Sequence, residues 1–443
     1  MGMPERQSFR AEEEYLSALV SQIRYKKARS LVAEELAAHI QDQKEALMEA
    51  GMDEEAALAE SVRQMGDPLE VGMEMDRIHR PRLDLRLLAL IAVLSLAGLF
   101  LQYQIGGLAE STGFADSFAR HCLGTGLGLA VMAAVYFLDY TLVERYALPL
   151  WLLLSGWLIA SGFLSPHVNG SRAYTQISLY LYVPVFAGLL CRARRRGIAG
   201  FAACLILMAL TVLLGVGTCG TLNVPFFLAL VCLMMITAAV GWGWFPLPRR
   251  RTILLLWGGA ALVPVLYAAL GGLSAYQAER LRFLLSPAAR QASRYTADYA
   301  TANVRELLHA SRLAGNTGLP AGQLLPSLSS DYVFTFAVSS YGILAGIALA
   351  AALAFLAARI LGISRRQTNQ LGRMISLGCG LVFAVEAAHY ILANCGISLL
   401  SQTWLPFFSS GLRASLVTYV FAGLLLSVRR FQDVVGTGHR AGD

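Results

Sequence analysis

One carboxylate in this sequence lies where it could do chemistry at a membrane surface. Asp331 follows Leu325-Pro326-Ser327-Leu328-Ser329-Ser330 and precedes a long apolar segment. A carboxylate at a lipid–water boundary can accept a proton from a sugar hydroxyl, which is general-base catalysis. At a helix start it can equally act as an N-cap, because free N–H groups and the helix dipole stabilise negative charge there. Asp331 therefore has a catalytic and a structural interpretation.

A second polar pair lies inside an apolar segment. Glu386 and His389 are three residues apart and therefore share one face of a helix. Ionisable side chains cost about 2.5 to 3.5 kcal/mol at the middle of a membrane helix, so each is a candidate for function. The two residues could form a proton relay. Alternatively, they satisfy each other or neighbouring backbone inside a helix bundle.

The elements around these residues are those of a membrane protein. The chain has 443 residues, of which 56% are hydrophobic and 15% charged, and its mean hydropathy is +0.54. Residues 1–85 hold 11 basic and 18 acidic residues, whereas the remainder has a net charge of +14. Most arginines of the remainder cluster between apolar segments, as the positive-inside rule predicts. The overall charge of +7 is therefore no evidence for nucleic-acid binding, and we expect none.

Ten segments are long and apolar enough, or nearly so, to cross about 30 Å of hydrocarbon as helices. They are residues 87–105, 122–141, 146–164, 175–191, 198–216, 222–245, 252–272, 332–359, 372–393 and 411–428. With alternating spans, the arginine clusters fall on one side, which predicts a multi-pass plasma-membrane protein with both termini in the cytoplasm. The expected fold is all-α.

The same topology leaves residues 273–331 as a large outer loop. Loops of this length inside a compact fold are usually functional or disordered. This loop has helical apolar stripes and several arginines, namely Arg280, Arg282, Arg290, Arg294, Arg305 and Arg312. An amphipathic segment of this kind is typical of an interfacial helix near lipid headgroups or an anionic lipid-linked substrate. A solvated surface loop is the alternative.

The sequence divides into three parts. Residues 1–85 predict a small cytoplasmic helical domain, with two helices between residues 11 and 47 and a third from Asp53 to Gly66. Residues 86–430 form the membrane domain, and residues 431–443 form a cytoplasmic tail. The seven cysteines include no C-x-x-C pair. We therefore expect neither a disulfide framework nor a zinc site, and no metal-ligand cluster is visible.

Several motifs in residues 86–430 resemble the SEDS family, the FtsW, RodA and SpoVE group of bacterial cell-wall proteins. Leu325-Pro326 and Ser330-Asp331-Tyr332-Val333-Phe334, with the later Gly342, resemble the family's L-P-x-x-x-T-D-[FY]-[IV]-[FL] stretch. Val168-Asn169-Gly170-Ser171-Arg172 is similar to V-N-G-A-x-R-W, and Pro184 to the proline of Q-P-S-E-x-x-K. Leu405-Pro406-Phe407-Phe408-Ser409-Ser410-Gly411 resembles L-P-F-x-S-Y-G-G, and Asn394 and Gly396 resemble its N-x-G.

The first domain resembles the permease-prefix domain found ahead of some transporter-like membrane proteins. The similarity lies in phrases such as Glu34-Glu35-Leu36 and Met65-Gly66-Asp67-Pro68.

The SEDS resemblance implies a peptidoglycan glycosyltransferase. The residue matching Asp331 would deprotonate the sugar hydroxyl of one lipid II molecule, which displaces undecaprenyl pyrophosphate from another with inversion. Substrate contacts are implied for Asn169, Arg172, Pro406, Ser409, Gly411 and Arg413. The family works with a class B penicillin-binding protein in division, cell shape or sporulation. A divalent cation on the pyrophosphate is suggested by family analogy alone.

The sequence also departs from the family pattern. Phe186 and Leu189 replace the Glu and Lys of the span-four motif, and Ser339 and Ser340 replace a later Glu-Glu. These changes remove charges expected at a substrate site, although Arg413 could supply one. Two other functions therefore stay open. The chain could be a non-catalytic scaffold or regulator of the wall-synthesis complex, or a translocator of lipid-linked precursor in which Glu386 and His389 take part.

Overall fold

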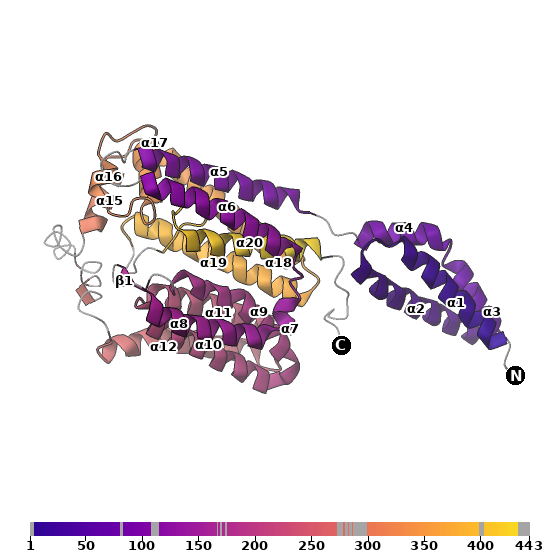
Figure 1. Ribbon diagram of the computed structural model, residues 1–443. Coiled ribbons are helices and arrows are strands. Elements are labelled where there is room, and N and C mark those ends of the chain that lie inside the picture. Colours follow the sequence, from indigo (N-terminus) through magenta and orange to yellow (C-terminus); the bar gives the residue numbers. More distant parts are fainter. Residues whose placement is uncertain are drawn as a thin grey trace. The chain divides into compact units, whose positions relative to one another are not determined.

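The computed structural model describes residues 4–79, 83–107, 115–165, 167–168, 171–172, 175–272, 278–279, 282, 286, 299–397 and 403–432. The chain forms two compact units (Figure 1). One unit comprises Met1–Asp84 with Val428–Asp443, and the other comprises Leu85–Ser427.

The first unit is helical. Its helices are α1 (Pro4–Gln22), α2 (Lys26–Glu49), α3 (Glu54–Gln64) and α4 (Pro68–His79). Apolar side chains of α1 and α2, such as Leu19, Val32 and Ile40, are almost completely buried. These positions recur at helical spacing, so burial of one apolar stripe per helix explains the unit.

Helix α4 is additional to the three helices predicted for this unit, the third of which was expected to end near Gly66 because Asp67-Pro68 follows. Proline is tolerated at the first position of a helix, where its missing N–H would be unpaired in any case. Gly66 turns the chain with φ +84°, and the Asp67 carboxylate accepts a hydrogen bond of 2.9 Å from the Leu69 N–H. The dipeptide therefore ends one helix and begins the next.

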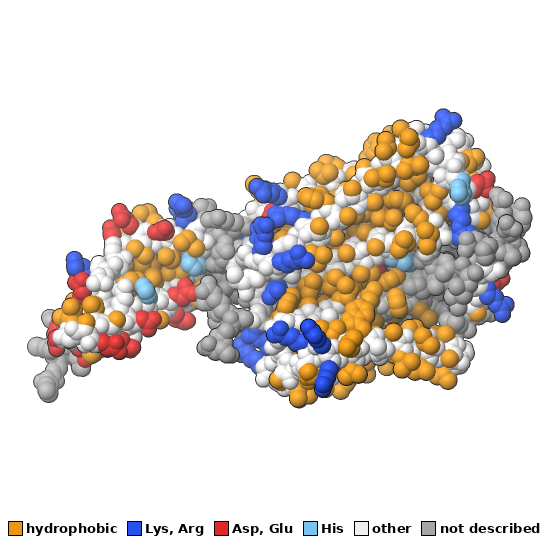
Figure 2. All heavy atoms as spheres, turned by 180° about the vertical axis from the view of Figure 1, so that it is seen from behind, with side chains coloured by type: hydrophobic (Ala, Val, Ile, Leu, Met, Phe, Trp, Pro, Cys, Tyr) orange, Lys and Arg blue, Asp and Glu red, His pale blue; other side chains and the backbone are white. Residues whose placement is uncertain are grey.

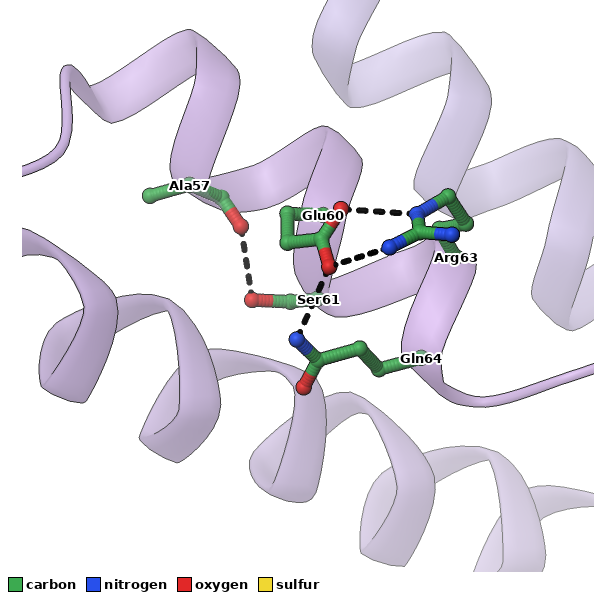
Figure 3. Close-up of polar contacts among 5 residues, drawn as sticks. All are labelled: Ala57, Glu60, Ser61, Arg63 and Gln64. Atoms are coloured by element: carbon green, nitrogen blue, oxygen red, sulfur yellow. Dashed lines mark hydrogen bonds and ion pairs between the residues drawn. The ribbon is translucent and has the colours of Figure 1, made fainter.

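The surface of α3 is charged (Figure 3). Glu60 accepts hydrogen bonds from the Arg63 guanidinium at 2.7 Å and from Gln64 Nε2 at 2.9 Å. The bonds from Arg63 lower the pKa of Glu60 to about 2. Solvent-exposed pairs of this kind contribute little to stability. We see here a solvated helix face and no catalytic arrangement.

The second unit is almost entirely helical. Its elements are α5 (Leu85–Gly107), α6 (Ala115–Phe137), α7 (Leu142–Arg145), α8 (Ala147–Leu164), η1 (Ile177–Leu181), α9 (Tyr182–Ala193), η2 (Arg194–Arg196), α10 (Gly197–Cys219), α11 (Asn223–Gly241), α12 (Arg249–Ala269), α15 (Tyr299–His309), α16 (Ala321–Leu324), α17 (Val333–Tyr341), α18 (Ile343–Arg366), α19 (Gln370–Asn394) and α20 (Leu412–Arg430). Two-residue strands β1 (His167–Val168) and β2 (Ser171–Arg172) pair antiparallel. The all-α fold is confirmed.

In the described part of the chain, nine helical stretches are long and apolar enough to cross a membrane. One of them, Ile177–Cys219, is 43 residues long and contains two of the ten predicted spans. Gly197, with φ +57°, separates α9 from α10, and these two helices contact each other. The protein is a multi-pass membrane protein.

The predicted span 332–359 is wrong as a single helix. The structure divides it into α17 and α18 at Gly342, whose φ of +99° is a conformation that favours glycine. A Cβ at Gly342 would lie 2.5 Å from Ala314 Cα and 2.6 Å from the Leu313 oxygen. The outer loop therefore passes so close to this break that α17 and α18 cannot form one straight helix.

Helix α19 lies at the centre of this unit. It contacts α9, α11, α17 and α18, and side chains such as Met374 and Tyr390 are fully buried. In contrast, α12 packs on α11 and leaves residues such as Leu254 and Leu255 exposed, which suits a lipid-facing helix. Figure 2 shows hydrophobic side chains over the middle of this bundle and arginines toward its ends. That distribution is typical of a membrane-spanning surface.

Candidate functional site

Asp331 ends a tight loop that leads into α17. Ser327 turns the loop with φ +55°. Its carbonyl oxygen accepts hydrogen bonds from the N–H groups of Ser330 and Asp331, at 3.0 and 2.9 Å. These hydrogen bonds fix the backbone position of Asp331, and therefore the point from which its side chain extends.

Side chains of α19 cap the start of α17. Tyr390 Oη accepts a hydrogen bond of 3.0 Å from the Val333 N–H, and Asn394 Oδ1 accepts one of 3.2 Å from the Thr335 N–H. The N-cap residue of α17 is Tyr332, and no side-chain hydrogen bond caps the helix from that position. The structural interpretation of Asp331 as an N-cap is therefore wrong, and its carboxylate is available for another role.

The Asp331 carboxylate is partly buried. Ser330 Oγ donates a hydrogen bond of 2.9 Å to Asp331 Oδ1. Burial raises the pKa of Asp331 to about 6, while the bond from Ser330 opposes this rise. Removing a charge from water disfavours the ionised form of an acid. Asp331 is thus still mostly ionised at neutral pH, but it is a stronger base than an ordinary aspartate.

A second loop, Trp404–Ser410, lies against the Asp331 loop. Ser409 Oγ donates a hydrogen bond of 2.7 Å to the Ser330 carbonyl and accepts one of 2.8 Å from the Leu405 N–H. The Ser410 N–H donates to the Ser329 carbonyl at 2.8 Å. Two motifs that are about eighty residues apart in the sequence therefore form one continuous structure.

Helix α5 supports both loops from one side. Gln102 Nε2 donates to the Ser329 carbonyl at 2.7 Å and to the Phe408 carbonyl at 2.6 Å. One turn away, a Cβ at Gly98 would lie 2.1 Å from the Phe407 oxygen. Phe407 itself has φ +69°. The loop is thus pressed against α5 at a position that only glycine allows.

Other predicted contact residues surround this second loop. Pro406 is buried within it, and Gly411 joins it to α20 with φ +153°. Arg413 lies in the first turn of α20, which packs against Gly124 of α6 through Ser415 and Leu412. The structure brings Pro406, Ser409 and Gly411 together with Asp331.

The motif Val168-Asn169-Gly170-Ser171-Arg172, between predicted spans three and four, does not join the Asp331 loop in the way that Ser409 does. Asn169 lies outside the described residues. The Arg172 guanidinium lies against Gly162 of α8, and the Arg172 carbonyl accepts a hydrogen bond of 2.9 Å from Thr175 Oγ1. Among the described residues, no hydrogen bond or ion pair joins Arg172 to Asp331.

One arginine of the outer loop reaches the candidate site. Arg305, on α15, donates a hydrogen bond of 2.7 Å from Nη2 to the carbonyl of Gly396, directly after α19. Helix α15 buries Val304 and Leu307 completely and packs on α17. Of the other predicted loop arginines, Arg282 and Arg312 are exposed, and Arg280, Arg290 and Arg294 lie outside the described residues. Arg305 is therefore a cation that the fold places near the end of α19.

Glu386 and His389 lie within α19, and both are buried. Glu386 is fully buried and accepts hydrogen bonds from the hydroxyl groups of Tyr180 and Thr403. The His389 ring lies 4.5 Å from the Phe227 ring, centroid to centroid. Glu386 thus joins α19 to η1 through Tyr180, and to Thr403, which directly precedes the Trp404–Ser410 loop. Neither hydroxyl was identified from the sequence.

A histidine near the site was missed by the sequence analysis. His121 of α6 is 1% exposed and lies against the backbone of Ser409. Tyr390 was missed as well. A lone histidine at the end of an apolar segment and a tyrosine inside one are common in packed helices, so the sequence held no specific signal for either residue.

Comparisons with known proteins relate this geometry to one family. Residues 84–434 match the family that groups FtsW, RodA and SpoVE and is described as "Cell cycle protein". A protein of Trichlorobacter lovleyi named "Probable peptidoglycan glycosyltransferase FtsW" is 23% identical, and the match covers 78% of this chain and 92% of that protein.

Two solved structures have a similar fold. One, described as "Structural coordination of polymerization and crosslinking by a peptidoglycan synthase complex", has a TM-score of 0.59 and 23% identity and covers 79% of this chain and 98% of its own. The rod shape determining protein RodA of Thermus thermophilus has a TM-score of 0.53 and 20% identity and covers 79% and 97%.

Proposed function

The chain belongs to the FtsW, RodA and SpoVE family of cell cycle proteins, and we propose that it is an inverting peptidoglycan glycosyltransferase that polymerises lipid II. One observation carries the proposal. The carboxylate of Asp331 has no capping role, has a pKa raised to about 6, and lies where the Leu325–Asp331 and Trp404–Ser410 loops meet. These are properties of a general base.

In the proposed reaction, Asp331 removes the proton from the sugar hydroxyl of the acceptor. The acceptor oxygen forms a bond to the anomeric carbon of the donor. The bond between that carbon and the pyrophosphate oxygen breaks, and undecaprenyl pyrophosphate leaves with the electron pair. Attack and departure take place on opposite faces of the sugar, so the configuration is inverted. The proton remains on Asp331 until solvent removes it.

The departing pyrophosphate needs positive charge nearby. Arginine suits this role because its planar group of donors matches phosphate oxygens and stays charged. We assign this task to Arg305, Arg172 and Arg413, and substrate contact to Asn169, Pro406, Ser409 and Gly411. What supports the assignment is that Arg305 lies at the end of α19 and that Ser409 bonds directly to the Asp331 loop.

A divalent cation would supply further charge to the pyrophosphate. Within the described residues, no group of three or more His, Cys, Asp or Glu side chains is close enough to hold a metal ion. A cation at Asp331 would therefore depend on phosphate oxygens of the substrate for much of its coordination. The proposed proton transfer does not need such an ion.

The proposal includes a topology and a partner. Both termini lie in the cytoplasm and the Asp331 loop lies outside, because the arginine clusters at residues 192–196, 249–251 and 365–373 then all face inward. The partner is a class B penicillin-binding protein, which crosslinks the strands. The similar fold found in a complex that polymerises and crosslinks peptidoglycan supports this choice.

One observation favours a non-catalytic scaffold instead. Phe186 and Leu189 are only 4% and 6% exposed in α9, where the family has a charged pair. Ser339, in place of a family glutamate, is also buried. A site that has exchanged charges for apolar packing could retain partner binding without chemistry.

Measuring the polymerisation of labelled lipid II by the purified full-length protein distinguishes a polymerase from a non-catalytic scaffold. Wild type, with and without a class B penicillin-binding protein, should make glycan strands, and Asp331→Asn should make none. Asp139→Asn is a matched control, because the Asp139 carboxylate accepts a hydrogen bond from the Thr141 N–H and asparagine keeps that acceptor. No strands from folded, partner-binding wild type would favour the scaffold.

A further inference from the structure

The peptide group before Asp331 is held by two side chains from other elements. The Ser330 carbonyl accepts a hydrogen bond of 2.8 Å from Tyr390 Oη and one of 2.7 Å from Ser409 Oγ. Tyr390 Oη also accepts the Val333 N–H at 3.0 Å. A tyrosine hydroxyl has one proton to donate, so this geometry fixes its direction.

The peptide group after Asp331 is held in the same way, one turn further along α19. Asn394 Nδ2 donates 3.0 Å hydrogen bonds to the Asp331 carbonyl and to the Tyr390 carbonyl. Asn394 Oδ1 accepts the Thr335 N–H at 3.2 Å and Thr335 Oγ1 at 2.8 Å. Both N–H protons and the oxygen of the Asn394 side-chain amide therefore take part in hydrogen bonds. A flipped amide would place its NH2 group against a donor, so one orientation is fixed.

Both side chains are fully buried, with 0% exposure. Water therefore does not compete for these bonds, and an unpaired polar group left behind would be costly. Tyr390 and Asn394 lie four residues apart on α19, which packs against α9, α11, α17 and α18. A rigid element thus reaches the backbone on each side of one aspartate.

We propose that Tyr390 and Asn394 are positioning residues, which hold the two peptide groups flanking Asp331 so that only its side chain remains free to move. This inference rests on the proposed function, because it gives the two residues a task in the reaction of Asp331. They hold the Asp331 loop through its backbone carbonyls, so they act through Asp331 and do not need to touch substrate. A base displaced by about 1 Å can lose on the order of a hundredfold in rate.

Titratable side chains near the Asp331 loop come from several elements of the described part of the chain. Tyr332 is adjacent in sequence, Tyr390 comes from α19, His121 of α6 lies against Ser409, and Arg305 of α15 lies at Gly396. These groups also contribute to the pH dependence of the rate in the variants.

The first test is Tyr390→Phe, which removes the hydroxyl and keeps the ring. We expect kcat for lipid II polymerisation to fall by about tenfold or more while KM stays within about twofold, because misplacement of the base affects the chemical step. The acid half-maximum of the rate should also move to lower pH, since a loosened loop admits water to Asp331. Asn394→Ala should act in the same direction.

Tyr182→Phe is the matched control. Tyr182 is a buried tyrosine of α9 whose hydroxyl is 2.9 Å from Ser155 Oγ, with no contact to the Asp331 loop among the described residues. This variant should keep kcat, KM and the pH profile of wild type. Equal losses in Tyr390→Phe and Tyr182→Phe, or an unchanged rate in Tyr390→Phe, would overturn the inference.

A second measurement does not require activity. In Asp331→Cys, the rate of maleimide labelling reports how accessible position 331 is. The labelling rate of the Asp331→Asn protein, which has only the seven native cysteines, is subtracted as background. Adding Tyr390→Phe should increase this rate several-fold, and adding Tyr182→Phe should not. If wild type makes no polymer, the proposed function fails while this assay still decides the positioning. Equal labelling rates would contradict it.

Discussion

Among single residues, the proposed reaction depends most on the ionisation of Asp331. Burial raises its pKa to about 6, so the carboxylate is protonated below this pH and ionised above it. A protonated carboxyl cannot accept a proton. We therefore expect the polymerisation rate to fall by half near pH 6 and by about a further tenfold for each lower pH unit. A rate that stays constant down to pH 4.5 would contradict this role.

Burial of the charge also predicts the stability of the variant that removes it. An acid whose pKa is raised by folding favours the folded state in its protonated form, so ionised Asp331 opposes folding at neutral pH. Asp331→Asn removes this cost. The purified variant should unfold in detergent at the same temperature as wild type or a higher one, and a much lower melting temperature would show that the carboxylate has a structural role.

Arg305 offers a test of the substrate site. Arg305→Ala removes a cation at the end of α19 and its hydrogen bond to Gly396. We expect a several-fold loss in kcat/KM, because arginines near developing phosphate charge stabilise the transition state. Arg312→Ala is the control, since Arg312 is exposed in the same outer loop. Equal effects of the two changes would indicate general electrostatics instead of a local contact.

The sequence could predict some of these residues and not others. Asp331 was identifiable because an ionisable side chain at the border of an apolar segment is rare and because the motif around it is fairly specific. Ser409 and Asn394 were identified only through their resemblance to family motifs. Tyr390 and His121 were not identified, because their contacts connect distant segments. Nothing in the local spacing of a buried tyrosine indicates which carbonyl its hydroxyl will meet.

At the scale of elements, close approach of α5 to the Trp404–Ser410 loop is the feature most open to test. A Cβ at Gly98 would lie 2.1 Å from the Phe407 oxygen, whereas one at Gly126 of α6 meets nothing within 4 Å. Gly98→Ala should therefore destabilise the protein by about 1 to 3 kcal/mol or more and reduce polymerisation, because backbone must shift.

Gly126→Ala is the matched control, and it should be neutral or stabilising by up to about 1 kcal/mol because alanine favours the helix. Thermal unfolding and lipid II polymerisation measure both effects. Similar melting temperatures for the two variants would mean that the loop does not press against α5.

The elements that the sequence misjudged share one physical cause. Hydropathy and periodicity predict where apolar helices lie, but they do not predict where a tertiary contact breaks one. Gly342 separates α17 from α18 because the outer loop passes within 2.6 Å of where its Cβ would be. Pro68 begins α4 because the Asp67 side chain supplies the first acceptor. The break at Gly342 and the helix start at Pro68 both depend on local geometry, which cannot be predicted from composition.

At the scale of the whole molecule, the proposed topology places the first unit and the Asp331 loop on opposite sides of the membrane. Asn316 in the outer loop and Glu55 in α3 are both exposed. In intact cells, an impermeant maleimide should label Asn316→Cys and should not label Glu55→Cys until the membrane is permeabilised. Labelling of Glu55→Cys in intact cells would reverse the topology.

Asp331 is proposed here as the base of a lipid II polymerase. The most direct measurement is kcat/KM for strand formation by Asp331→Asn relative to wild type, with the penicillin-binding protein present and folding checked by melting temperature. Loss of a general base predicts a decrease of about 10²- to 10⁴-fold. A folded Asp331→Asn protein that polymerises within about threefold of wild type would contradict the claim, whatever the other residues do.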